Sequence, residues 1–159
     1  MNADGLQALL ATELPITQHL GIEVVRLDES GVELRLPLAA NRNHKGALFA
    51  GSLNAAATLA GWGVLVAALE TRGVDALVVI QDSSVRYLSP VRSDAIARCA
   101  APAAEALDTA LRTLQRRGLA RLALTAEIGE GKEREPAVRF TGRYVLHRPG
   151  PDVTRAPAS

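Results

Sequence analysis

Residues Gly46–Leu69 read GALFAGSLNAAATLAGWGVLVAAL, a run without a charged side chain that decides the fold. The run is long enough to cross a bilayer. However, it contains Ser52, Asn54 and Thr58, and small residues dominate its first half. A helix that is apolar nearly all round, but thin, is typical of a central helix enclosed by a sheet. We therefore predict a long core helix here and no membrane span.

Segments with apolar residues at every second position lie on both sides of this helix, which is the pattern of half-buried strands. Two further segments, Ala3–Glu13 and 103–117, have the periodicity of amphipathic helices. The expected strands are 21–27, 32–38, 76–88, 93–101, 119–128 and 137–147. This order predicts an α+β fold in which a six-stranded, mainly antiparallel sheet wraps the long helix.

Length and composition narrow the class of protein. The 159 residues suit a single domain, which we place at residues 1–147, and the Pro-rich, polar tail 148–159 is expected to be disordered. The formal net charge is +1, and no basic stripe with interleaved aromatics occurs, so no nucleic-acid partner is expected. The N-terminus has no basic segment followed by an apolar one, so a cytoplasmic location is the expectation.

Metal and cofactor chemistry finds no support in the sequence. Cys99 is the sole cysteine, which excludes a disulfide within the chain and favours a small buried side chain. His19, His44 and His147 lack the spacing of metal ligands, and no Gly-rich phosphate-binding motif occurs. We expect no metal and no cofactor.

The segment Asn43–Ser52 is predicted to be a loop that ends in the N-terminus of the long helix. The first N–H groups of a helix lack intrahelical partners and carry partial positive charge, which suits a carbonyl oxygen or a developing oxyanion. Gly46 and Gly51 would permit close backbone approach, Ser52 would cap the helix, and the Asn43 amide would donate to the same oxygen. The alternative is a Gly-containing turn before an ordinary core helix.

Five short motifs carry a resemblance to known proteins: NRNHKG at 41–46, FAGS at 49–52, LAGWG at 59–63, YLSPV at 87–91 and FTGRY at 140–144. On these motifs the chain resembles the hotdog-fold thioesterase superfamily, within it the putative-thioesterase branch found as the C-terminal domain of YiiD-type proteins. The resemblance covers about residues 15–144. It implies substrates that are acyl groups on coenzyme A or acyl carrier protein, and a homodimer or dimer of dimers with active sites at subunit interfaces.

Two departures from the family pattern affect the chemistry. Many hotdog thioesterases carry His-Gly-Gly at the start of the central helix, where this chain has Phe49-Ala50-Gly51. Many also place an Asp or Glu about two turns into the helix, close to Thr58 here, with Asn54 one turn earlier. No acid lies between Lys45 and Glu70. The usual hydrolytic carboxylate is therefore absent.

Hydrolysis of a thioester needs an activated water and an oxyanion site. The oxyanion site would be the Gly51 and Ser52 N–H groups with the Asn43 amide. Asp82, inside an apolar strand, is the best candidate base, and its alternative role is an ion pair with Arg86 or a bond to nearby backbone. His44 is a second candidate, since imidazole exchanges protons near neutral pH, although a loop histidine is often simply solvated.

Two other functions stay open. Decarboxylation of a malonyl thioester needs carbonyl polarisation but no base, and some members of this branch are assigned as malonyl-acyl-carrier-protein decarboxylases that supply acetyl primer for fatty-acid synthesis. A non-catalytic acyl-thioester binding module would also lack the helix acid. Arg92 is expected near the mouth of the site. The candidate substrate-binding residues are Gly46, Phe49, Asn54, Thr58, Arg42, Lys45 and Arg86.

Overall fold

The computed structural model describes residues 1–131 and 135–150 of the chain. Its elements follow the predicted order, with two short helices added. The helices are α1 (Ala3–Glu13), α2 (Ile16–Leu20), α3 (Leu38–Asn41), α4 (Ala50–Thr71) and α5 (Ala104–Arg117). The strands are β1 (Glu23–Asp28), β2 (Gly31–Leu36), β3 (Leu77–Tyr87), β4 (Ala95–Ala100), β5 (Leu119–Gly129) and β6 (Val138–His147).

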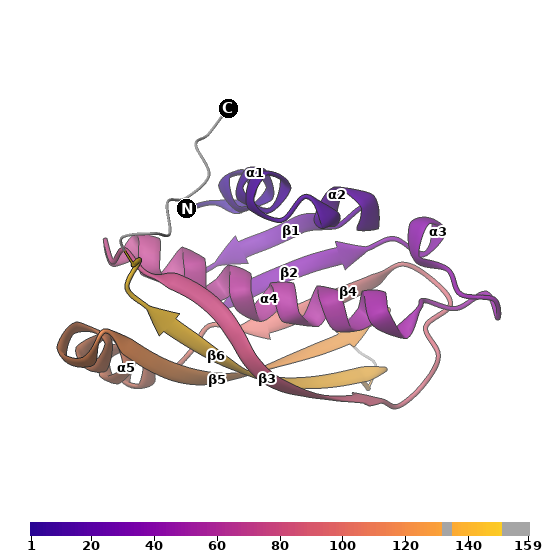
Figure 1. Cartoon of the computed structure of the whole chain (residues 1–159). Helices are drawn as coiled ribbons and strands as arrows, with labels where there is room; N and C mark the ends of the chain where they lie inside the picture. The colour runs from indigo at the N-terminus through magenta and orange to yellow at the C-terminus, as the bar shows by residue number, and fades with distance from the viewer. Residues whose placement is uncertain (132–134, 151–159) are drawn as a thin grey trace.

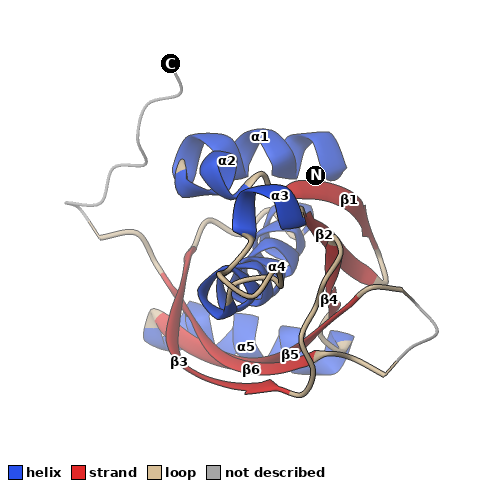
Figure 2. Ribbon diagram, turned by 90° about the vertical axis from the view of Figure 1, so that its right-hand side faces the viewer, coloured by secondary structure: helices blue, strands red, loops and turns tan. Residues whose placement is uncertain are grey.

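One six-stranded sheet in the order β1-β2-β4-β5-β6-β3 curves around α4, and every neighbouring pair is antiparallel (Figures 1 and 2). In this order, β1 and β3 are the two edge strands of the sheet. Helices α1 and α5 pack on the same side as α4: Leu6 of α1 lies against Gly63, and Leu107 of α5 lines a cavity with Val64. Among the described residues, no helix covers the opposite face of the sheet over β5 and β6, where every second residue of β5 is exposed.

Helix α4 is the core of the molecule. By length and composition alone it qualifies as a membrane span, but 72% of its most apolar window is buried inside the chain. It contacts β2, β4, β5, β6 and β3, as a helix enclosed by a sheet must. The predicted central helix is confirmed.

Two of the sequence motifs meet at the middle of α4. Tyr144, fully buried on β6, donates a hydrogen bond from its hydroxyl to the Thr58 carbonyl oxygen at 2.8 Å. A Cβ atom on Gly61 would lie only 2.5 Å from Cζ of Tyr144 and closer still to the hydroxyl oxygen. Trp62 donates from its indole nitrogen to the Val78 carbonyl on β3 at 3.0 Å. Gly61 thus lets the sheet approach the helix closely, and the arrangement is the predicted hotdog fold.

Several predicted boundaries differ from the structure. Strand β2 ends at Leu36 rather than 38, because α3 begins at Leu38. Helices α2 and α3 have 5 and 4 residues, too few to give a periodic signal in the sequence. The structure describes residues 129–131 of the predicted turn at 129–132, and Gly129 is the last residue of β5. Residues 151–159 of the predicted disordered tail lie outside the described residues.

Candidate functional site at the start of the central helix

Helix α4 begins without a side-chain cap. Phe49 occupies the N-cap position, and the first intrahelical bond runs from the Leu53 N–H to the Phe49 carbonyl at 3.1 Å. The N–H groups of Ala50, Gly51 and Ser52 have no hydrogen-bond partner among the described residues. The prediction that Ser52 caps the helix is wrong, because Ser52 is the third helical residue and only 6% exposed. The three free N–H groups make this end a site for an anion or a carbonyl oxygen.

The Asn43 side chain is held in one orientation beside this helix start. Its Oδ1 accepts hydrogen bonds from the backbone N–H groups of Lys45 at 2.9 Å and Ala47 at 3.1 Å. Its Nδ2 has only a long contact of 3.5 Å with the Leu48 carbonyl. Because the acceptor end of the amide is saturated by backbone, the donor end is the part left for another oxygen.

The loop that carries Asn43 is fixed to three neighbouring segments. The Phe49 N–H donates to the Asn41 carbonyl at 2.8 Å, and the Leu48 N–H donates to the Val91 carbonyl at 2.8 Å. Arg92 donates from Nη1 to the Lys45 carbonyl at 3.0 Å. These bonds preorganise the loop, so a bound carbonyl would meet donors already in place.

Two residues of this scaffold were missed by the sequence interpretation. Asn41 is 4% exposed and donates from Nδ2 to the Leu20 and Pro37 carbonyls, each at 2.8 Å. Tyr87, the last residue of β3, donates its hydroxyl to the Ala50 carbonyl at 3.0 Å and so links the sheet edge to the helix start. The NRNHKG and YLSPV motifs contain both residues, but a motif alone does not reveal which carbonyl a side chain reaches.

Gly51, Asn54 and Thr58 lie on one stripe of α4. Positions three and four apart share a helix face, and this stripe is the less buried one. The Asn54 Oδ1 atom is buried and has no hydrogen-bond partner in the part of the chain that the structure describes, an uncommon state for a side-chain oxygen. Trp62, further along the stripe, bonds to β3. The stripe therefore runs from the free N–H groups along the side of α4 that faces β3.

The structure explains the two glycines differently from the sequence. Gly46 has φ +73°, a left-handed conformation that glycine adopts most easily, and a Cβ there would meet nothing within 4 Å. A Cβ on Gly51 would lie 3.0 Å from Cδ1 and Cζ of Phe49 and closer still to Cε1. The Phe49 ring, 56% exposed, thus rests on the first turn. In this structure the absence of a side chain at Gly51 makes room for the Phe49 ring, rather than for a substrate as the sequence suggested.

Asp82 does not point toward the helix start within this chain. A β-bulge between Ile80 and Asp82 shifts the register, so that Ile80 pairs with Tyr144 but Asp82 pairs with Arg143. Tyr144 faces α4, and adjacent strand residues face opposite ways, so Arg143 and Asp82 lie on the other face of the sheet. Asp82 is 56% exposed there and forms an ion pair with Arg143 at 3.2 Å. An ion pair is the structural role expected of Asp82, but with Arg143 rather than Arg86.

The remaining predicted residues divide between the loop and the far face. Arg42, His44 and Lys45 are exposed on the loop that carries Asn43. Arg86 lies directly opposite Arg139 and shares its face, away from α4. The structure therefore brings the loop residues to the helix start and separates Arg86 from them.

The residues whose pKa values are shifted lie around the site rather than in it. The Asp94 carboxylate accepts from the Leu38 N–H at 2.8 Å and from Arg35 Nη2 at 2.6 Å, and these bonds lower the pKa of Asp94 below its usual value. Asp94 thereby anchors the start of α3, which leads into the Asn43 loop. Burial raises the pKa of the Cys99 thiol to about 12, so Cys99 is no nucleophile. Among residues 1–131 and 135–150, no cluster of His, Cys, Asp or Glu side chains is arranged to hold a metal.

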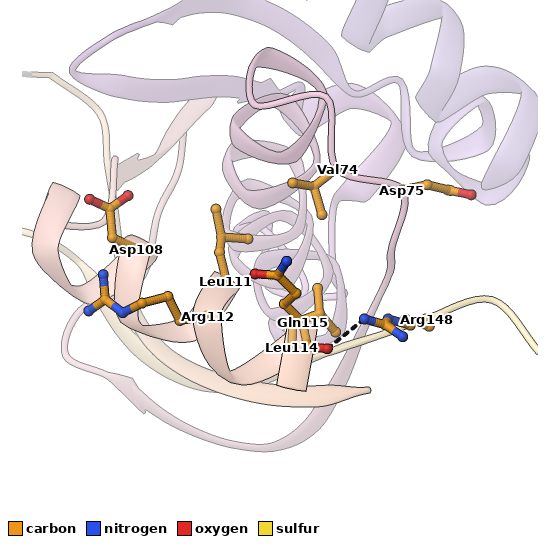
Figure 3. A pocket seen from close by; sticks show the side chains of 8 residues that line it. All are labelled: Val74, Asp75, Asp108, Leu111, Arg112, Leu114, Gln115 and Arg148. Atoms are coloured by element: carbon orange, nitrogen blue, oxygen red, sulfur yellow. Dashed lines mark hydrogen bonds between the residues drawn. The ribbon is translucent and has the colours of Figure 1, made fainter. Parts of the chain in front are cut away.

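A cavity of about 500 Å³ lies near the other end of α4 (Figure 3). Val74, Leu111 and Leu114 form its apolar part, and Arg148 at its rim donates to the Gln115 carbonyl at 2.6 Å. Val74 follows the C-terminus of α4, and a helix of 22 residues is about 33 Å long. This cavity is therefore separate from the helix start.

Comparison with known proteins identifies relatives over nearly the whole chain. The family model described as "Putative thioesterase (yiiD_Cterm)" matches residues 3–148. A protein of unknown function from Chlorobaculum tepidum is 30% identical, with a TM-score of 0.87 over 92% of this chain and 94% of that one.

Two solved structures share the fold at lower identity. A putative thioesterase from Shewanella oneidensis is 24% identical with a TM-score of 0.76, covering 92% of this chain and 97% of that one. A probable thioesterase from Pseudomonas aeruginosa is 21% identical with a TM-score of 0.79, covering 92% and 96%.

Proposed function

Since the chain belongs to the putative-thioesterase family of YiiD C-terminal domains, we propose that it acts on acyl thioesters whose carbonyl oxygen binds at the start of α4. One observation carries this proposal: free N–H groups at Gly51 and Ser52 lie at the end of a loop that fixes the Asn43 amide as a donor. Such preorganised donors stabilise negative charge on the oxygen as the reaction proceeds.

Hydrolysis is the first candidate reaction, in keeping with the family. Water would attack the thioester carbon, the tetrahedral oxyanion would be held by the helix start, and the thiol would leave with a proton. His44, on the Asn43 loop, is the candidate for moving that proton. Asp82 would need to act from the opposite face of its strand, so His44 is the better placed of the two.

Decarboxylation of a malonyl thioester is the second candidate, and one observation favours it. The stripe of α4 carries no carboxylate, since no acid lies between Lys45 and Glu70, and Asp82 faces away. Breaking the bond between Cα and the carboxylate releases CO2 and leaves its electron pair in an enolate, whose oxygen the same N–H groups would stabilise. A proton from water then gives the acetyl thioester. No base is required.

Asn54 and Thr58 would line the acyl group, with Gly46 and Phe49 at the entrance, and Arg42, Lys45 and Arg92 beside it. The carrier would be coenzyme A or acyl carrier protein, in the cytoplasm where these thioesters are made. Association through the β3 edge would enclose this stripe, because β3 is an edge strand exposed on both faces from Val79 to Ser84. We propose a homodimer or a dimer of dimers formed this way.

Mass spectrometry of the products distinguishes the candidates. The purified protein is incubated with malonyl-, acetyl- and medium-chain acyl thioesters on both coenzyme A and acyl carrier protein. Free acid and free thiol identify hydrolysis, whereas acetyl thioester formed from malonyl thioester identifies decarboxylation. If every thioester binds but none changes, the chain is a binding module and the enzymatic proposal is wrong.

A further inference from the structure

A row of charged side chains crosses all six strands on the face of the sheet opposite α4. The strand register places its members directly opposite one another in the sequence Arg26, Glu33, Arg98, Glu127, Arg139 and Arg86. The first five alternate in sign. Glu33 lies 3.3 Å from Arg26 and 3.7 Å from Arg98, and Glu127 lies 3.6 Å from Arg139. Neighbouring strands are about 4.8 Å apart, so each charge meets its neighbour.

The alternation fails at the last pair, on the edge strand. Arg86 of β3 is opposite Arg139 of β6, where continued alternation would require an acid. Like charges directly opposite each other destabilise a sheet. Within the described residues Arg86 has no ion pair or hydrogen bond through its side chain, and Arg139 is 53% exposed. The row therefore ends in two adjacent, incompletely neutralised guanidinium groups at the edge of the sheet.

This arginine pair is close to the site but on the other side of the sheet. Tyr87, the residue after Arg86, bonds to the Ala50 carbonyl at the start of α4. Adjacent residues of a strand face opposite ways, so Arg86 is level with the helix start and separated from it by the thickness of the sheet. A flexible arm attached to a partner on the outer face would reach the helix start by passing the end of β3.

The shape of this surface decides what kind of anion it suits. Binding sites for small molecules are concave and mostly apolar. The row is hollowed where Glu33, Arg98 and Glu127 line a cavity, but Arg86 and Arg139 do not line it. Long, exposed arginines on such a surface match the acidic side chains of a protein partner, with binding that is steered by charge and weakened by salt.

We propose that Arg86 and Arg139 form the docking surface for an acidic carrier protein, which presents its acyl thioester to α4 around the end of β3. This inference rests on the proposed function for the identity of the partner. It assigns the carrier protein, rather than coenzyme A, as the form of substrate that this face recognises.

The test compares Arg86→Glu with Arg112→Glu, which makes the same change of charge on the exposed face of α5. Binding of fluorescently labelled holo acyl carrier protein is measured by anisotropy at about 50 mM and about 300 mM salt. We expect at least a tenfold weaker affinity for Arg86→Glu at low salt, a smaller loss for Arg86→Ala, and wild-type affinity for Arg112→Glu. Wild-type binding should weaken strongly at the higher salt.

Two further measurements separate docking from a structural role. A carboxylate opposite Arg139 completes the alternation, so Arg86→Glu should melt at the wild-type temperature or about 1–3 °C higher, although it binds less well. The ratio of kcat/KM for carrier-borne over coenzyme A-borne substrate should fall at least tenfold. Unchanged carrier binding overturns the inference, and so does an equal loss with both substrates.

Anisotropy does not depend on turnover, so the two proposals can fail separately. A protein that binds carrier through Arg86 but turns over no thioester would refute the proposed reaction and leave the docking surface standing. If the protein turns over both substrates and Arg86→Glu changes neither carrier binding nor turnover, the docking surface is refuted and the proposed reaction stands.

Discussion

Gly61→Ala tests the closest approach between the helix and the sheet. The added methyl would lie 2.5 Å from Cζ and 2.8 Å from Cε2 of Tyr144, where carbon atoms normally keep about 3.5–4.0 Å. Tyr144 is fully buried and held by its bond to the Thr58 carbonyl, so it cannot move aside. Overpacking costs about 1–3 kcal/mol and loss of the hydrogen bond about 1 kcal/mol. Against this, alanine gains about 1 kcal/mol over glycine within a helix. The net destabilisation is about 1–3 kcal/mol.

Urea denaturation at one fixed protein concentration measures this effect, because any association would add to the apparent stability. Gly63→Ala is the matched control: it lies two residues further along α4, and its methyl would meet only the flexible end of Leu6 at 3.1 Å. We expect the control to be as stable as the wild type or up to about 1 kcal/mol more stable. Tyr144→Phe should not rescue Gly61→Ala, because the ring carbons remain. Equal stability of the two alanine variants would refute the packing argument.

The other predictions concern the site and its surroundings. Asn43→Ala should lower turnover by about 10²–10³-fold, and an unchanged rate would rule out its role as a donor. It should also lower the melting temperature by a few degrees, because the Lys45 and Ala47 N–H groups lose their acceptor. Gly51→Ala should cost less than about 1 kcal/mol, because the exposed Phe49 ring can swing away, yet it should change the KM; a loss as large as that of Gly61→Ala would mean the ring is fixed. Since the Leu38 N–H and Arg35 lower the pKa of Asp94, its ionised form stabilises the fold at neutral pH and this contribution disappears as pH falls through the lowered pKa. The difference in urea midpoint between wild type and Asp94→Asn should therefore be largest near about pH 6 and shrink as the pH falls below about 4, and a pH-independent difference would contradict this. Cys99 in the native protein should resist iodoacetamide at about pH 8 and react on unfolding, and rapid native labelling would show that the thiol is accessible.

The central helix and the strand order could be predicted because both are local patterns. A charge-free run that is rich in alanine and glycine predicts a thin core helix, and period-two alternation predicts each strand before any tertiary contact is known. The short helices α2 and α3 leave no such pattern, since each is about one turn long. Their positions depend on tertiary bonds, such as that from Asn41 Nδ2 to the Leu20 carbonyl.

The orientation of Asp82 could not be predicted, because it depends on one extra residue in a β-bulge of β3. Val78 and Ile80 face α4, since they pair with Leu146 and Tyr144, so strict alternation would turn Asp82 toward α4 as well. The bulge after Ile80 adds one residue and turns Asp82 to the opposite face. No sequence pattern marks this bulge.

The helix start illustrates what a motif can and cannot show. The position of Asn43 ahead of the helix predicted a donor near the free N–H groups, and that donor's orientation depends on backbone bonds to Lys45 and Ala47 that only the structure reveals. Gly51 suggested close approach by a substrate, but the group that approaches it in the structure is the ring of Phe49.

A crystal structure with a non-hydrolysable acyl-thioester analogue, in which a methylene group replaces the thioester sulfur, tests the central claim most directly. We predict that the carbonyl oxygen lies about 2.7–3.1 Å from the N–H nitrogens of Gly51 or Ser52 and from Asn43 Nδ2, with the acyl chain along Asn54 and Thr58. A carbonyl bound elsewhere, for example in the cavity beside α5, with the helix start left free, would contradict it.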